Sequence, residues 1–114
     1  MGGAYIGHPA LRPFKVRVTN AGHPITQGIK DFFVNDEQHF VHYDKDPKNI
    51  LIEAENVDGL TFEDLGTKSI AGWAFEYGHG RVVFTAPGHT IHALWAPEYL
   101  NLQRRAVRWL LKEI

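Results

Sequence analysis

The segment that most constrains the fold of this chain is residues 73–95, WAFEYGHGRVVFTAPGHTIHALW. A glycine-rich turn at residues 77–80 separates two apolar runs, which is the pattern of a β-hairpin. The unbroken apolar run at residues 82–84 predicts a strand that is buried on both faces. His89 and His92 follow the end of that strand, where α/β proteins often carry their functional groups. The segment therefore predicts a core hairpin with a candidate site beside it.

Hydropathy patterns predict strands before the hairpin and a helix after it. Residues 14–19 alternate apolar and polar side chains, residues 32–43 form a second extended segment, and residues 50–54 form a short strand. Residues 1–13 are rich in glycine and proline, so we expect them to be irregular. Pro97 suits the first turn of a helix running to Ile114, whose broad apolar face indicates packing against a sheet.

These elements predict a mixed α/β fold that is α+β-like in isolation. It consists of a mixed or antiparallel sheet, a hairpin and a packed carboxyl-terminal helix. With 114 residues, the chain has room for one domain, which we take to span residues 1–114.

Composition excludes several classes of function. The formal net charge of -1 gives no reason to expect nucleic acid or an anionic membrane as a partner. The chain has no cysteine, which excludes disulfides, thiolate metal sites and cysteine nucleophiles. Neither a membrane-length apolar run nor a signal-peptide pattern occurs in the sequence, so we expect a soluble, cytoplasmic protein.

Asp36 and Glu37 are adjacent acids in an extended segment, and His39 follows two residues after Glu37. Strand alternation places Glu37 and His39 on one face and Asp36 on the other. A carboxylate beside an imidazole serves as a general acid–base pair or supplies part of a metal site. A solvated strand edge or bulge explains the same acids without any function.

His89 follows Gly88 at the end of the apolar strand, and glycine permits a backbone geometry that turns the next side chain into a crevice. His89 is therefore a candidate general base, sugar ligand or metal ligand, the alternative being a histidine with structural hydrogen bonds alone. On a helical turn, His89 and His92 share one side. With Glu37 or His39 they form a ligand set suited to zinc or another divalent ion.

Trp73, Arg81, His92 and Trp95 are candidate substrate-binding residues. Tryptophan faces stack on pyranose rings, although core packing explains both tryptophans equally well. Arg81 either clamps an anion or pairs with a neighbouring carboxylate. We assign no catalytic role to the remaining histidines, which lie near turns or strand ends: His8, His23, His42 and His79. His8 and His23 each precede a proline, which favours a structural role.

Several of these motifs together resemble the trehalose-utilisation (ThuA-like) family, which is related to the class I glutamine amidotransferase-like superfamily. They are residues 23–26 (His-Pro-Ile-Thr), Asp36-Glu37, Trp73, residues 77–82 and Gly88-His89, followed by Trp95 and the closing helix. The resemblance implies that the chain is a partial domain, corresponding to the carboxyl-terminal half of a flavodoxin-like ThuA domain. A half-domain exposes a sheet edge or face, so we expect a homodimer or a strand-exchanged oligomer.

The resemblance also implies a role in sugar catabolism, with keto-disaccharides as the substrate class and His89, Glu37 and Asp36 as the catalytic residues. Glutaminase chemistry is excluded because that chemistry needs a cysteine. Three functions stay open: a carbohydrate-active enzyme with an acid–base pair in a cleft, a non-catalytic carbohydrate-binding or assembly module, and a divalent-metal enzyme using a His/His/Glu set. In the first two the partner is a small-molecule sugar.

Overall fold

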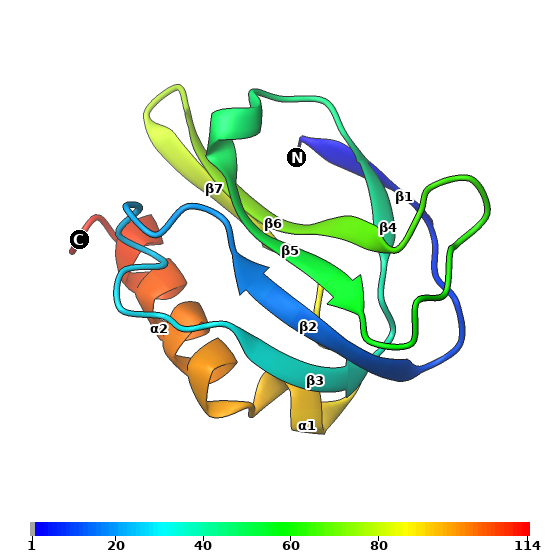
Figure 1. Ribbon diagram of the computed structural model, residues 1–114. Helices are drawn as coiled ribbons and strands as arrows, with labels where there is room; N and C mark the ends of the chain where they lie inside the picture. The colour runs from blue at the N-terminus through cyan, green and yellow to red at the C-terminus, as the bar shows by residue number, and fades with distance from the viewer. Residues whose placement is uncertain (1) are drawn as a thin grey trace.

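The computed structural model describes residues 2–114 and shows a curled five-stranded sheet, a two-stranded sheet and a helical layer (Figure 1). The five-stranded sheet has the order β3-β2-β5-β6-β7, and the small sheet pairs β1 with β4. The elements are β1 (Gly3–Gly7), β2 (Arg12–Val18), β3 (Phe32–Asp36), β4 (Phe40–Tyr43), the 3₁₀ turn η1 (Pro47–Asn49), β5 (Ile50–Asn56), β6 (Lys68–Tyr77), β7 (Gly80–Thr85), α1 (Ile91–Leu94) and α2 (Pro97–Leu110).

All strand pairs among residues 2–114 are antiparallel, which confirms the expected mixed α/β fold with a hairpin and a packed carboxyl-terminal helix. The hairpin joins β6 and β7 through Gly78 and His79, because Tyr77 pairs with Gly80 across the turn. Gly78 has a φ of 58°, a left-handed conformation that glycine adopts without steric cost.

The hydrophobic core lies between the five-stranded sheet and α2 (Figure 1). Phe14 and Val16 of β2 are buried on one face of the sheet, because alternate strand residues point to the same side. On the opposite face Arg17 forms ion pairs with Glu53 and Glu55 at 3.3 and 2.9 Å. The sheet therefore has one apolar face and one polar face, as is common for antiparallel sheets.

Helix α2 covers the apolar face with a stripe of buried residues at helical spacing: Tyr99, Leu102, Ala106 and Trp109. Arg81 of β7 fixes the end of this helix, because its guanidinium donates to the carbonyl oxygens of Trp109 and Ile114 and lies 4.6 Å from the centre of the Trp109 ring. Among residues 2–114, neither helix has the length and apolar character that a bilayer-spanning segment needs.

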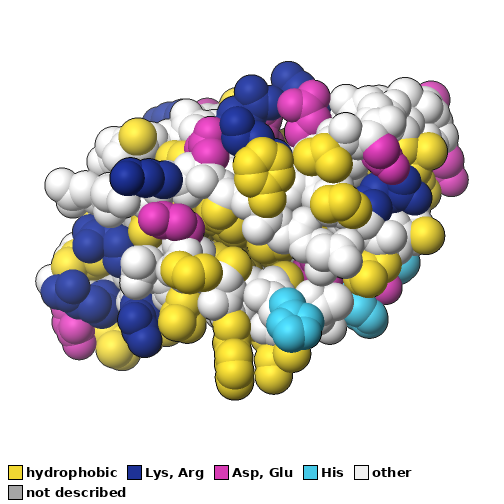
Figure 2. Space-filling model, turned by 60° about the horizontal axis from the view of Figure 1, so that its bottom comes forward, with side chains coloured by type: hydrophobic (Ala, Val, Ile, Leu, Met, Phe, Trp, Pro, Cys, Tyr) yellow, Lys and Arg dark blue, Asp and Glu magenta, His cyan; other side chains and the backbone are white. Residues whose placement is uncertain are grey.

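The outer side of the helical layer keeps several apolar side chains at the surface, among them Ile91, Trp95 and Val107. Figure 2, which brings this side of the molecule forward, shows hydrophobic side chains among basic ones and histidines. The homodimer or strand-exchanged oligomer expected from the sequence stays a prediction, as does the partial-domain assignment of residues 1–114.

The expectation that residues 1–13 are irregular is wrong, because they contain β1 and the start of β2. Gly3 explains the difference. A Cβ atom at Gly3 would lie 2.7 Å from the carbonyl oxygen of His42 and 2.9 Å from a ring carbon of Trp73. The glycine here permits close packing of a strand, not a turn.

Two further local expectations need correction. Residues 82–84 lie in β7, which is half-buried at the edge of the sheet and is not buried on both faces. Residues 32–43 do not form one extended segment: they split into β3 and β4, which belong to different sheets. The three residues between these strands, 37–39, carry the chain from one sheet to the other.

Candidate functional site

The candidate site lies at the crossing between β3 and β4. Gln38 in the middle of this crossing is fully buried, and its side-chain nitrogen donates to the carbonyl oxygen of Ala54 at 3.1 Å. Its side-chain oxygen accepts a hydrogen bond from Nδ2 of Asn56 at 3.2 Å. Because successive side chains point to opposite sides of an extended chain, burial of Gln38 presents Glu37 and His39 together on the other side.

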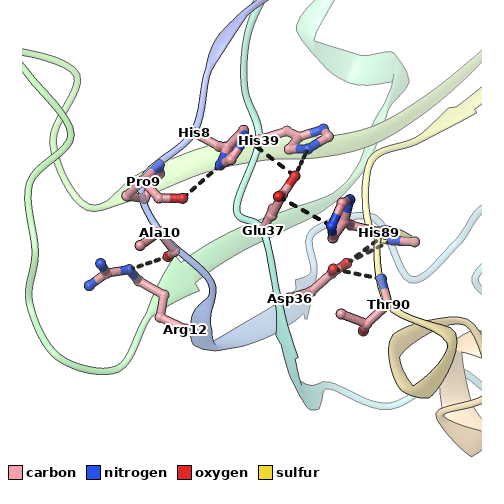
Figure 3. A network of polar contacts seen from close by, with 10 residues as sticks. His8, Pro9, Ala10, Arg12, Asp36, Glu37, His39, His89 and Thr90 are labelled. Carbon is pink, nitrogen blue, oxygen red and sulfur yellow. Dashed lines mark hydrogen bonds and ion pairs between the residues drawn. The ribbon is translucent and has the colours of Figure 1, made fainter.

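Glu37 lies among three imidazoles that come from three separate segments, as Figure 3 shows. Its Oε1 lies 3.2 Å from Nε2 of His39 and 3.3 Å from Nε2 of His8, and its Oε2 lies 3.4 Å from Nε2 of His89. The side chains of Glu37, His39 and His8 are 18%, 28% and 29% exposed, whereas that of His89 is 58% exposed. We call these four residues the Glu37 cluster; a ligand in solution can reach it.

The surroundings of Glu37 favour its ionised form. The hydrogen bond from His39 lowers the pKa of Glu37 most, partial desolvation raises it, and charge on His8, His89 and His39 lowers it further. The net effect is a pKa below the ordinary glutamate value. Glu37 is therefore a carboxylate at neutral and mildly acidic pH.

The ring of His8 has a fixed orientation. Its Nδ1 lies 2.7 Å from the carbonyl oxygen of Pro9, and because a carbonyl oxygen only accepts, Nδ1 carries a hydrogen and donates it. In a neutral ring, Nε2 would then present a lone pair to Oε1 of Glu37 at 3.3 Å. In this orientation a neutral His8 ring can donate its Nε2 lone pair to a cation beside Glu37.

Asp36 has a different task from its neighbour Glu37. It is fully buried, and its carboxylate accepts hydrogen bonds from the backbone nitrogens of Gly88, His89 and Thr90 at 2.7, 3.3 and 3.1 Å. These bonds attach the loop after β7 to the end of β3 and hold the backbone of His89 beside Glu37 (Figure 3). The structure thus gives Asp36 the geometry of a positioning residue.

An apolar pocket of about 390 Å³ adjoins the Glu37 cluster. It is lined by Gly3, Ala4, Tyr5, His39, Val41, Trp73 and Phe84. His39 belongs to both the pocket and the cluster, and the Tyr5 ring meets it edge-on with 5.2 Å between ring centres. Trp73, although almost fully buried, forms part of the wall and stacks on Phe84 at 4.3 Å. The pocket and the cluster therefore adjoin at His39.

The other candidate substrate-binding residues lie elsewhere in the described structure. His92 lies in α1 and Trp95 directly follows it, and both are exposed. Arg81 lies at the start of β7, where it contacts the end of α2 and also Glu76 at 3.6 Å. The contacts described here bring Glu37, His39 and His89 together and place Arg81 against the end of α2, while substrate binding by Arg81, His92 and Trp95 stays a prediction.

His8 was not among the site residues predicted from the sequence, because the following Pro9 indicated a structural role. Its position depends on the pairing of β1 with β4, in which Gly7 lies opposite Phe40 and the register shifts between Tyr5 and Gly7. This pairing brings His8 to His39, with 5.3 Å between the ring centres. The sequence signal that could have indicated His8 as a site residue is a strand with an aromatic residue, Tyr5, followed by the Gly7-His8 step.

Comparison with protein families matches residues 1–110 to the family ThuA, described as "Trehalose utilisation". The chain belongs to the ThuA family. This confirms the resemblance found in the sequence, and the match includes all four members of the Glu37 cluster. Family membership supports a function related to trehalose utilisation and carbohydrate metabolism. Comparison with curated proteins gives no match.

The first prediction concerns Asp36. Replacement by alanine leaves the backbone N–H groups of residues 88–90 without their acceptor, and each unsatisfied buried group costs about 1–3 kcal/mol. We expect Asp36→Ala to lower the free energy of unfolding by about 3 kcal/mol in urea denaturation, and Asp64→Ala, at an exposed position, to change it by less than about 0.5 kcal/mol. Equal effects of the two variants would contradict the positioning role.

The second prediction concerns the pKa of Glu37. Because this pKa is lowered on folding, the ionised carboxylate stabilises the fold above the unfolded-state value, and this stabilisation is lost as the pH falls through the folded-state value. We expect the Glu37 carboxyl to titrate below the ordinary glutamate value of about 4.3 in carbon-detected NMR. His39→Ala should move the midpoint upward, because it removes the largest cause of the shift. No movement in that variant would disprove the assigned cause.

Proposed function

We propose that this chain acts on a sugar by proton transfer at the Glu37 cluster. The observation that carries the proposal is the carboxylate of Glu37 with three imidazole nitrogens at 3.2–3.4 Å beside an apolar pocket of about 390 Å³. Imidazole is the side chain that exchanges protons near neutral pH, and an adjacent carboxylate orients the ring and stabilises its protonated form. The family's link to carbohydrates supports a sugar as the ligand.

In this proposal His89 transfers the proton and Glu37 is its partner in the acid–base pair. His89 is the most exposed member of the cluster, so it has the best access to a ligand. Its backbone is held by Asp36, and its Nε2 faces Oε2 of Glu37, the oxygen that His8 and His39 leave free. When His89 takes a proton, Glu37 stabilises the resulting positive charge.

The keto-disaccharide class that the sequence resemblance implies suits this pair. A carbon beside a keto group carries a proton of raised acidity. His89 takes that proton, the electrons of the broken C–H bond form the enol double bond, and a protonated imidazole of the cluster protonates the carbonyl oxygen. The step converts a keto-sugar into its enol and needs no cysteine, which the chain lacks.

A second candidate function is favoured by the geometry of His8. Among residues 2–114, the group of potential metal ligands whose donor atoms all lie within 4.8 Å of one another is His8, Glu37 and His39. Ligands about 2.0–2.1 Å from a tetrahedral zinc ion are about 3.3 Å apart. The distances of 3.3 and 3.2 Å from Oε1 of Glu37 to His8 and His39 fit this value. The bond from His8 to Pro9 is also typical of zinc-bound histidine.

This donor set fits a divalent ion, and it shares only His39 with the predicted set of His39, His89 and His92, because His8 and Glu37 take the places of the other two. When bound, the ion would polarise the keto oxygen or activate a water molecule. His8 and His39 would hold it together with Glu37, while His89, on the other carboxylate oxygen, would keep its role in proton transfer.

The third prediction tests proton transfer. We expect His89→Ala to lower kcat/KM for a keto-disaccharide by at least about 100-fold, the usual contribution of a general acid or base. His79→Ala, in the exposed hairpin turn, should keep full activity, and both variants should retain wild-type unfolding curves. Equal activity of the two variants would show that His89 does not transfer the proton. Sugar binding without turnover by the wild-type chain would instead favour a non-catalytic carbohydrate-binding module.

The fourth prediction tests the metal site. We expect calorimetric titration of the wild-type chain with zinc to show one bound ion per chain, confirmed by elemental analysis. His8→Ala and His39→Ala should each weaken binding at least about tenfold because each removes a ligand. His89→Ala should retain the ion. Zinc affinity that is the same in His8→Ala as in the wild type would exclude this site.

A further inference from the structure

We propose that the apolar pocket beside the Glu37 cluster binds an apolar, aromatic aglycone of the keto-sugar and not a second sugar ring. This inference rests on the proposed function, since it assumes that the keto-sugar ring itself occupies the Glu37 cluster. It narrows the substrate class from keto-disaccharides to keto-glycosides with an aromatic aglycone.

The side chains of the pocket wall offer a second sugar few hydrogen-bonding partners. Gly3, Ala4, Val41 and Phe84 have no polar side-chain atom, and Trp73 is almost fully buried. Tyr5 and His39 carry the remaining polar side-chain atoms of the lining. A sugar ring carries a hydroxyl on most of its carbons, and a hydroxyl buried without a partner weakens binding. An aromatic ring has no such cost and gains by contact with the wall.

The size of the pocket suits one or two rings. An apolar cavity of about 150 Å³ accommodates benzene. At about 390 Å³, this pocket leaves room for a phenyl ring with substituents or for a fused pair of rings. The volume also falls at the lower end of the range of about 300–1,000 Å³ that is usual for small-molecule sites.

The pocket is held in shape by aromatic contacts. Trp73 stacks on Phe84 with 4.3 Å between ring centres and an interplanar angle of 20°, and Tyr43 packs on Trp73 with 4.8 Å between ring centres. A wall that is already packed loses little conformational freedom when a ring binds. Aromatic rings attract such neighbours beyond the effect of the area they bury.

The position of the pocket matches an aglycone attached to a sugar at the Glu37 cluster. His39 separates the two: its Nε2 donates to Glu37 at 3.2 Å, and its ring meets the edge of Tyr5 at 5.2 Å. A glycoside lying across His39 would place its polar ring against the charged groups and its apolar group against Tyr5. Tyr5 is exposed and comes from the edge strand β1, so it forms the open side of the pocket.

The test uses three keto-glycosides with the same keto-glucosyl part and different aglycones: phenyl, methyl and, in keto-trehalose, glucosyl. Their affinities are measured by calorimetry with the full chain and with four variants that keep the Glu37 cluster. Ala4→Phe fills the pocket with a side chain at an exposed strand position. Ala21→Phe makes the same change at an exposed turn and serves as the matched control.

We expect the phenyl compound to bind the wild-type chain about tenfold more tightly than the methyl compound or keto-trehalose. Ala4→Phe should remove this difference by weakening phenyl binding, and Ala21→Phe should preserve it. Tyr5→Ala should weaken phenyl binding several-fold, whereas Tyr77→Ala, at the exposed end of the hairpin, should not. Unfolding curves of all variants verify that they are folded.

Equal affinity for the three aglycones, a phenyl preference that persists in Ala4→Phe, or no binding of any of the three would overturn the inference. The result also separates this inference from the proposed function. Turnover without a phenyl preference would leave proton transfer at the Glu37 cluster intact and refute the aglycone pocket. A pocket-dependent phenyl preference without turnover would support the pocket and refute catalysis.

Discussion

The buried amide of Gln38 determines how the two sheets of this protein meet. Its hydrogen bonds to the backbone of Ala54 and to the side chain of Asn56 anchor the crossing from β3 to β4 inside the core. A buried amide is costly without partners, so this crossing has little freedom to shift its register. A shift by one residue would bury Glu37 or His39 in place of Gln38. The positions of Glu37 and His39 on the opposite side of the crossing follow from the burial of this one side chain.

Two adjacent carboxylates acquire opposite tasks from this arrangement. Asp36 points into the protein, where three backbone N–H groups satisfy its charge. Glu37 points outward, where imidazoles surround it and solvent reaches it. Asp36 fixes the loop that carries His89, and Glu37 contacts the imidazole ring of His89. The two neighbouring acids therefore contribute differently to the same site: Asp36 positions its loop, and Glu37 supplies its negative charge.

The sequence predicted the parts of the fold that depend on local pattern. The hairpin around Gly78, the helix beginning at Pro97 and the opposite orientations of Asp36 and Glu37 all follow from short-range periodicity or turn chemistry. The sequence did not predict strand β1 or the participation of His8 in the site. Both depend on the long-range pairing of β1 with β4, which was hard to foresee from glycine-rich residues. The edge position of β7 was missed for a similar reason: an apolar run does not reveal how many neighbours its strand has.

The charge balance of the Glu37 cluster links its two proposed functions. Because Nδ1 of His8 donates to Pro9, Nε2 of a neutral His8 ring offers its lone pair beside Oε1 of Glu37, where a cation would bind. A cation there would offset part of the Glu37 charge. His89 lies against the other carboxylate oxygen, Oε2, outside this donor set. The proposed proton transfer by His89 and the proposed cation binding by His8 and His39 therefore use different oxygens of one carboxylate, and neither proposal excludes the other.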